Sequence, residues 1–246
     1  KGRFFGMHIF FLIRAIAVSV FKINAIIFHC FSFKFFHHSP VHGKCQPGRM
    51  TDTVAEMTTN DHPLTTVTKQ FRAVAALIEA DQWALPTPCA DWNVTELIGH
   101  VIAGSQMAAA IAGGADRGEA IDLLSTDFVG DDPIGALDRA LSLAETTLIQ
   151  PDIDERICQH PAGDMPGSQV RSLRISDLVV HQWDLARTIG ADESLDAEVV
   201  QIAWDDISPM APIIAQLGVF GDGPSATVAD DAPLQLRLLD LMGRRP

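Results

Sequence analysis

The sequence predicts an all-α protein, an antiparallel four-helix bundle with additional C-terminal helices. Apolar residues recur at helical spacing in four long segments, and Pro and Gly residues separate these segments with connections of modest length. Strand signals are weak, and the best of them, residues 225–229, is short. The chain has 246 residues, of which 47% are apolar, so it can bury a substantial core.

The first two helices are expected between residues 64 and 114. Apolar residues from Leu64 to Trp83 follow helical spacing and predict the first helix, after which two prolines force an extended connection. The second helix is expected to begin near Asn93. This side chain can cap the helix while Glu96 lies three residues on, which is the capping-box pattern. Two consecutive glycines at 113 and 114 end this helix.

Proline and glycine residues also predict where the other helices begin and end. Pro133 is expected to open the third helix, which ends before Pro151. Residues 152–171 contain two Pro and two Gly and are expected to be irregular. The fourth helix spans about 173–189 and stops at Gly190, and a fifth covers about 196–207 and can resume after Pro212. Residues 233–242 predict one more short helix.

Two different compositions meet near residue 49. Residues 1–49 contain seven Lys or Arg, no Asp or Glu and ten of the 13 Phe, whereas the remainder holds 11 basic and 31 acidic residues. Arg14 and Lys22 interrupt the apolar stretches, so no run reaches the roughly 18 residues of a membrane-spanning helix, and no clear signal cleavage site follows. We expect a reading frame opened too early, with the natural start at Met50.

Two alternatives for this segment stay open. Residues 1–49 can be a targeting or membrane-associated segment, with residues 1–36 at the membrane interface, or a folded part of the protein. The rest of the chain is divided into a disordered lead-in over 50–63, the bundle over 64–190 and a C-terminal helical extension over 191–246.

Charge, cysteine content and missing motifs exclude several classes. A net charge of −13 argues against a nucleic-acid partner, because neutralising phosphates requires clustered Lys and Arg. The four cysteines are too scattered for a disulfide scaffold or a paired-cysteine zinc site, which favours a reduced, cytoplasmic compartment. Glycine-rich phosphate-binding motifs and the nucleophile motif of serine hydrolases are absent.

Two histidines lie in the middle of predicted helices among apolar neighbours. These are His100 in the second helix and His181 in the fourth, and Asp177 precedes His181 by four residues, so that both project from one helix face. If the two helices face each other, His100, Asp177 and His181 supply three ligands for a divalent ion and leave positions open. The alternative is a hydrogen-bonded Asp–His pair in a plain helical bundle that binds no metal.

Three segments carry a family resemblance. WALPTPCADWNVTELIGHV (83–101), LVVHQWDLARTIG (178–190) and the closing LLDLMGRRP resemble the mycothiol-dependent maleylpyruvate isomerase-like family, one of the DinB-like metal-binding bundles. The resemblance runs from about Leu64 to Pro246. It implies a divalent metal ion, zinc foremost, on His100, Asp177 and His181, with Asp177 standing where the family pattern has Glu.

Other polar and aromatic residues receive weaker assignments. Asp184 can accept a hydrogen bond from a ligand imidazole N–H, or it can instead interact with Arg187 on the helix surface. Arg171 and Arg174 precede the Asp177 helix face and are the candidates for binding a substrate carboxylate. Three further residues are expected to be structural, namely Cys89, Trp92 and Trp183.

The resemblance implies a metal-dependent enzyme of small-molecule thiol chemistry with mycothiol as cosubstrate. The metal would favour the thiolate, which adds to an electrophilic carbon of a small substrate. Elimination of the thiol would make the protein an isomerase, and a persistent adduct would make it a transferase. A metal-dependent binding protein or sensor without turnover is the alternative from another class.

Overall fold

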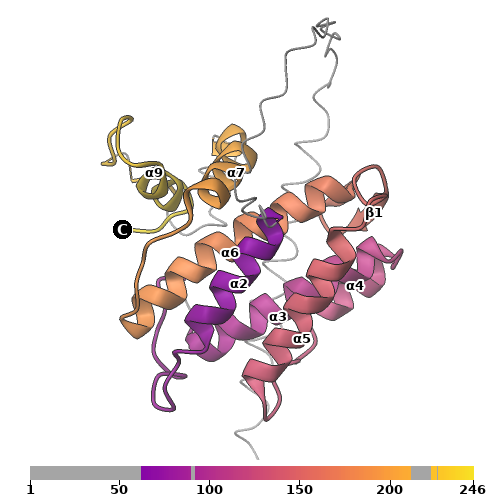
Figure 1. The fold of residues 1–246 in the computed structure, drawn as a ribbon, viewed down its shortest axis with the longest axis horizontal. Helices are drawn as coiled ribbons and strands as arrows, with labels where there is room; N and C mark the ends of the chain where they lie inside the picture. Colours follow the sequence, from indigo (N-terminus) through magenta and orange to yellow (C-terminus); the bar gives the residue numbers. More distant parts are fainter. Residues whose placement is uncertain (1–61, 90–91, 212–222, 226) are drawn as a thin grey trace, which may run out of the picture.

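The computed structural model describes residues 62–246 apart from 90–91, 212–222 and 226 (Figure 1). Expectations for residues 1–61, including the start at Met50 and the disordered lead-in, lie outside the described residues, as does a helix resuming after Pro212. Where the chain is described it is mostly helical, which confirms the predicted fold class.

Four long helices form the bundle, namely α2 (Pro63–Ala75), α3 (Val94–Ala112), α5 (Pro133–Leu148) and α6 (Gly167–Ile189). Helices α2 and α3 each pack against both α5 and α6, so the apolar faces of all four meet in one core (Figure 1). Fully buried side chains from each helix fill it, among them Phe71, Leu97, Leu141 and Leu178. This closed arrangement fixes α3 and α6 side by side.

The predicted starts of α3 and α5 are confirmed. The Asn93 side chain accepts a hydrogen bond from Glu96 N at 3.0 Å, and Glu96 Oε2 accepts one from Asn93 N at 2.8 Å, which completes the capping box. Pro133 occupies the first turn of α5, where its missing N–H costs no helical hydrogen bond. At the end of α6, Gly190 has φ of 72°, a left-handed conformation that glycine adopts without strain.

The first helix is shorter than predicted, because α2 ends at Ala75 and not at Trp83. Beyond Ala75 the backbone hydrogen bonds span three residues instead of the four of an α-helix: Leu77 N donates to Val74 O, and Ile78 N donates to Ala75 O. Gln82 Oε1 accepts from Glu79 N at 2.9 Å, which closes a turn where the helix would have continued. The apolar spacing of residues 76–83 therefore reflects packing of a turn-rich segment and not a helix.

The segment between α3 and α6 holds two elements that the prediction missed. Helix α4 (Arg117–Leu124) is capped by Asp116 and Glu119, and a hairpin pairs β1 (Ile157–His160) with β2 (Gly163–Pro166). The expectation that 152–171 is irregular was therefore wrong. Helix α6 also begins six residues before the predicted position, because Gly167 packs on Ile153 and its N–H donates to Arg156 O at 2.8 Å.

The C-terminal part adds α7 (Ala197–Ile207), a short 3-10 helix η1 (Ser208–Met210) and α9 (Leu234–Leu241). Helix α7 packs on α6 and α9 packs on α7, on the side of the bundle away from α5 (Figure 1). The weak strand signal over 225–229 corresponds to no strand at the described positions, where Ser225 N donates to Asp240 Oδ1 at 3.1 Å.

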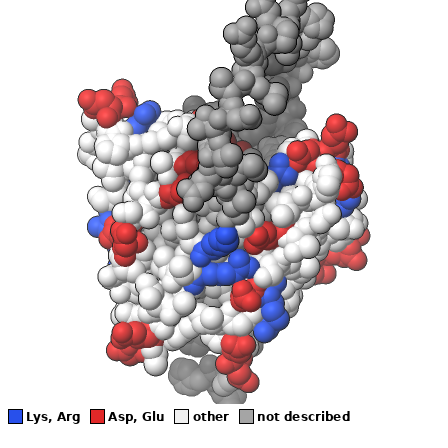
Figure 2. All heavy atoms as spheres, viewed as in Figure 1, with Lys and Arg blue, Asp and Glu red and all other residues white. Residues whose placement is uncertain are grey.

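Most of the described charged side chains lie on the surface, and the most apolar long helix lies inside the bundle. On the face shown in Figure 2, acidic side chains lie mainly in separate groups along the edges, and basic side chains gather mainly near the centre. Among the described residues, α3 alone is long and apolar enough to cross a membrane by length and composition. Because 67% of the most apolar stretch of α3 is buried inside the protein, its apolar character is explained by its place as the central helix of the bundle.

Candidate metal centre

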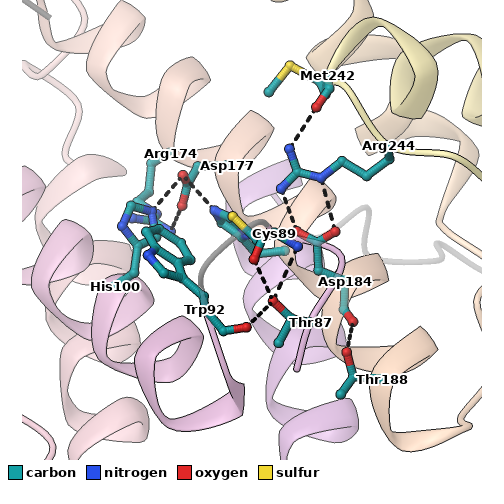
Figure 3. Close-up of polar contacts among 11 residues, drawn as sticks. Thr87, Cys89, Trp92, His100, Arg174, Asp177, Asp184, Thr188, Met242 and Arg244 are labelled. Atoms are coloured by element: carbon teal, nitrogen blue, oxygen red, sulfur yellow. Dashed lines mark hydrogen bonds and ion pairs between the residues drawn. The ribbon is translucent and has the colours of Figure 1, made fainter. Parts of the chain in front are cut away.

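The packing of α3 against α6 brings His100, Asp177 and His181 together. Figure 3 shows His100 and Asp177 facing each other across the two helices. His100 Nε2 lies 3.1 Å and His181 Nε2 lies 3.4 Å from Asp177 Oδ1, and the two imidazole centroids are 4.9 Å apart. One donor atom from each residue lies within 4.8 Å of the others. Two imidazole nitrogens and one carboxylate oxygen thus converge on one point between the helices.

Local helix geometry explains this convergence. Asp177 and His181 are four residues apart on α6, so their side chains share one face. His100 lies on the second turn of α3, whose start is fixed by the capping box at Asn93. The side chain of His181 is only 8% exposed, whereas those of His100 and Asp177 are 31% and 30% exposed. The cluster is therefore reached from solvent on the side of His100 and Asp177.

A buried ion pair lies behind His181. Asp184 Oδ2 accepts a hydrogen bond from His181 Nδ1 at 3.0 Å, as the first of the two predictions for Asp184 had it. Arg244 binds the same carboxylate with two nitrogens, Nε to Oδ1 at 3.0 Å and Nη2 to Oδ2 at 2.6 Å. Arg187 takes no part: it lies over the Trp183 ring and pairs with a glutamate. Because Asp184 holds the Nδ1 proton of His181, Nε2 is the nitrogen that faces Asp177.

The two candidate arginines lie in different places. Arg174 is buried, and its Nη2 donates to Asp177 Oδ2, so it belongs to the cluster (Figure 3). Gly104 on α3 leaves room for it, since a Cβ there would lie 2.3 Å from Arg174 Nη1. Arg171 is not part of the cluster: its Nη1 pairs with Asp154 at 2.6 Å and donates to Leu148 O at 3.0 Å.

Two residues expected to be structural line the cluster. The Trp92 ring centroid lies 4.6 Å from that of His100 and 5.7 Å from that of His181, so the indole covers both imidazoles. Cys89 forms a second close group with His181 and Asp184, which its isolated position in the sequence did not indicate. Burial raises the pKa of the Cys89 thiol to about 11, so it stays protonated at neutral pH. Trp183 is buried in the core, as predicted.

The part of the chain that contains this cluster matches a known protein family. Residues 64–186, half of the chain, match the family described as "Mycothiol maleylpyruvate isomerase N-terminal domain". The chain belongs to this family. The match confirms the resemblance drawn from the sequence, and it covers α2 to most of α6, including all three residues of the cluster.

Two relatives in Mycobacterium tuberculosis are similar over a longer range. They are "Uncharacterized protein MT0763" of strain CDC 1551 / Oshkosh and "Uncharacterized protein Rv0738" of strain H37Rv. Each is 29% identical over 163 residues, which cover 66% of this chain and 82% of the relative. No solved structure matches the chain.

The protonation states in this member of the mycothiol maleylpyruvate isomerase family follow from burial and charge. Burial would raise the pKa of Asp177, but Arg174 and the two imidazoles hold it well below its usual value. Burial lowers the pKa of His100, which is therefore neutral at pH 7. Burial acts the same way on His181, but the carboxylates of Asp177 and Asp184 outweigh it and raise its pKa to about 8.

The donor set fits the divalent ion that the family implies. Two imidazole nitrogens and one carboxylate oxygen are ligands that zinc and other first-row divalent ions accept, and three ligands leave room for a further molecule. Arg174 occupies Asp177 Oδ2 and leaves Oδ1 toward the imidazoles, while Asp184 orients His181. The cluster therefore offers the donor atoms and the outer hydrogen bonds that a metal site would need.

Proposed function

We propose that the protein binds a divalent metal ion, zinc foremost, through His100, Asp177 and His181, and uses it to react a small thiol with an electrophilic substrate. The convergence of these three donors, with Asp184 holding the outer nitrogen of His181, is the observation that carries the proposal. Membership of the mycothiol maleylpyruvate isomerase family supports mycothiol as the thiol. The reaction is then an isomerisation or a thiol transfer.

Each residue of the cluster has a definable task in this chemistry. When bound, the ion supplies a Lewis acid that lowers the pKa of a thiol ligand. His100 and His181 present Nε2 atoms, and Asp177 presents Oδ1 because Arg174 holds its other oxygen. Trp92 covers the imidazoles and keeps water from that side. These contacts hold the ligand atoms in place before any substrate arrives.

The charges of the site favour an anionic ligand. Asp177 is paired with Arg174, and Asp184 is paired with Arg244, so these four side chains sum to no net charge. Metal binding requires both imidazoles to be neutral, so the protein would not cancel the charge of a bound divalent ion. A thiolate or a substrate carboxylate is then attracted to the open position. Arg174 Nε, which is buried without a hydrogen-bond partner, adds to this attraction.

For an unsaturated substrate the thiol acts as a reversible nucleophile. The thiolate sulfur forms a bond to one alkene carbon, and the π electrons move toward the adjacent carbonyl. The former double bond is now single and can rotate. Return of the electrons expels the thiolate and restores the alkene in the trans geometry, so the thiol is regenerated. For other electrophiles the carbon–sulfur bond persists: the carbanion formed by addition takes up a proton, or a leaving group departs with its electron pair, and the product is a thiol conjugate.

The same proposal covers partners and location. The partners are a small-molecule thiol and an electrophile, with no nucleic acid, and the location is the cytoplasm, where thiols are kept reduced. A membrane partner enters only through residues 1–36.

Metal analysis of the full chain tests the proposal. The parent, His100→Ala, His181→Ala and a control His160→Gln, whose histidine lies in the hairpin, are loaded with zinc, dialysed and analysed for metal. About one ion per chain in the parent and control, lost from both cluster variants, is the expected result. No metal in the parent would overturn the proposal. Metal without thiol consumption or maleylpyruvate isomerisation would leave a binding protein or sensor.

A further inference from the structure

A single arginine near the end of the chain reaches the candidate metal centre. Arg244 lies 60 residues from Asp184 and outside the matched residues 64–186, yet its side chain is buried against that carboxylate. Its Nε and Nη2 bind the two oxygens of Asp184, and its Nη1 donates to Met242 O at 2.7 Å (Figure 3). All three nitrogens of the guanidinium are thus engaged.

The end of α9 directs this side chain toward the bundle. Leu238 and Leu239 are fully buried and fix the helix on its neighbours. Gly243 has φ of 75° and donates to Asp240 O at 2.9 Å, while Arg244 N donates to Leu239 O at 2.9 Å. These two bonds form a Schellman motif, which ends a helix and reverses the chain. Arg244 is therefore placed by well-packed backbone and not by a free tail.

The bond to Arg244 constrains Asp184. Asp184 is fully buried, and Oδ2 is shared between Arg244 Nη2 and His181 Nδ1. The planar guanidinium, bound through two parallel hydrogen bonds, fixes the plane of the carboxylate and keeps it ionised. Without Arg244, the carboxylate would be a buried charge held by one hydrogen bond, free to rotate or to take up a proton. His181 would then lose the acceptor that fixes which nitrogen carries its proton.

We propose that Arg244 is a positioning residue of the metal centre, acting through Asp184 to hold His181 Nε2 toward the ion. The inference rests on the proposed function, because it assumes that His181 is a ligand. It makes the C-terminal segment part of the site, although the family match ends within α6.

Variants of the full chain test this role. Arg244→Ala and Arg244→Lys are compared with Arg245→Ala, whose arginine is half-exposed and pairs with Asp240 at 3.5 Å. Zinc affinity is measured by competition with a chromophoric chelator. We expect Arg244→Ala to weaken zinc binding about 10- to 100-fold, Arg244→Lys to lose less, and Arg245→Ala to stay near the parent.

Two measurements separate this inference from simpler explanations. In the visible spectrum of the cobalt(II) form, Arg244→Ala should shift the absorption bands. If the ion pair only held α9 in place, its loss in Arg244→Ala would lower the unfolding temperature and leave both the zinc affinity and the spectrum unchanged. That second pattern would overturn the inference. If the parent binds no metal, the proposed function fails. In that case ¹⁵N NMR of metal-free His181, above about pH 9 where it is mostly neutral, still decides: loss of the Nδ1–H form in Arg244→Ala supports positioning, and its retention refutes it.

Discussion

Metal uptake at this site should release a proton whose amount depends on pH. His181 has a pKa of about 8, because Asp177 and Asp184 outweigh the effect of burial. It must lose its proton before Nε2 can bind a metal ion. His100 contributes little near pH 7, since burial lowers its pKa below the usual value. Each ion bound should therefore release about 0.9 proton at pH 7 and about 0.1 at pH 9.

The same competition sets the affinity. Protons oppose the metal, so zinc affinity should fall about tenfold for each pH unit below 8 and level off above it. Isothermal titration calorimetry in buffers with different ionisation enthalpies measures the released protons directly. Asp184→Asn, which removes one of the two carboxylates that raise the pKa of His181, should release fewer protons at pH 7. A binding heat at pH 7 that is the same in every buffer would refute the reasoning.

Three further predictions concern stability. Gly167→Ala should cost about 2 kcal/mol, measured by urea unfolding, because the new Cβ would lie 2.3 Å from Ile153 O; an unchanged midpoint would contradict the packing. Burial lowers the pKa of His160 to about 4, so the unfolded chain binds its proton more tightly. The parent should then lose about 2 kcal/mol, after allowance for screening, as pH falls from 6.5 to 4, and His160→Gln should lose less in the same denaturant series. Asn93→Ala should cost about 1 kcal/mol in thermal unfolding through loss of the α3 cap, with Thr95→Ala as a neighbouring comparison.

Elements whose ends are fixed by neighbouring residues were predicted well. The capping box at Asn93 and the proline at 133 act within one turn, so the starts of α3 and α5 follow from the sequence. The end of α2 and the start of α6 depend on partners far along the chain. Gln82 Nε2 lies 3.4 Å from Ile189 O, and Gly167 packs on Ile153, contacts that no local pattern encodes.

The residues of the site likewise fall into those that local spacing could predict and those that depend on packing between distant segments. Asp177 and His181 share a helix face, so their proximity could be predicted from spacing. His100 was a candidate because it lies in mid-helix among apolar neighbours, and the resemblance supported its place beside the other two. Arg174 is one turn from Asp177 and reaches it, whereas Arg171 is a turn earlier and meets Asp154 instead. The Arg244 contact spans 60 residues and depends on how α9 packs, so helical periodicity could not reveal it.

The burial of α3 has a consequence for synthesis of the chain. Its apolar surface is covered by α5 and α6, and 77 residues separate the end of α3 at Ala112 from the end of α6 at Ile189. At about 5–20 residues per second, a ribosome takes roughly 4–15 s to deliver them. For that interval α3, a helix with the length and composition of a membrane span, lacks part of its cover, which makes the nascent protein a substrate for chaperones or for the insertion machinery until α6 arrives.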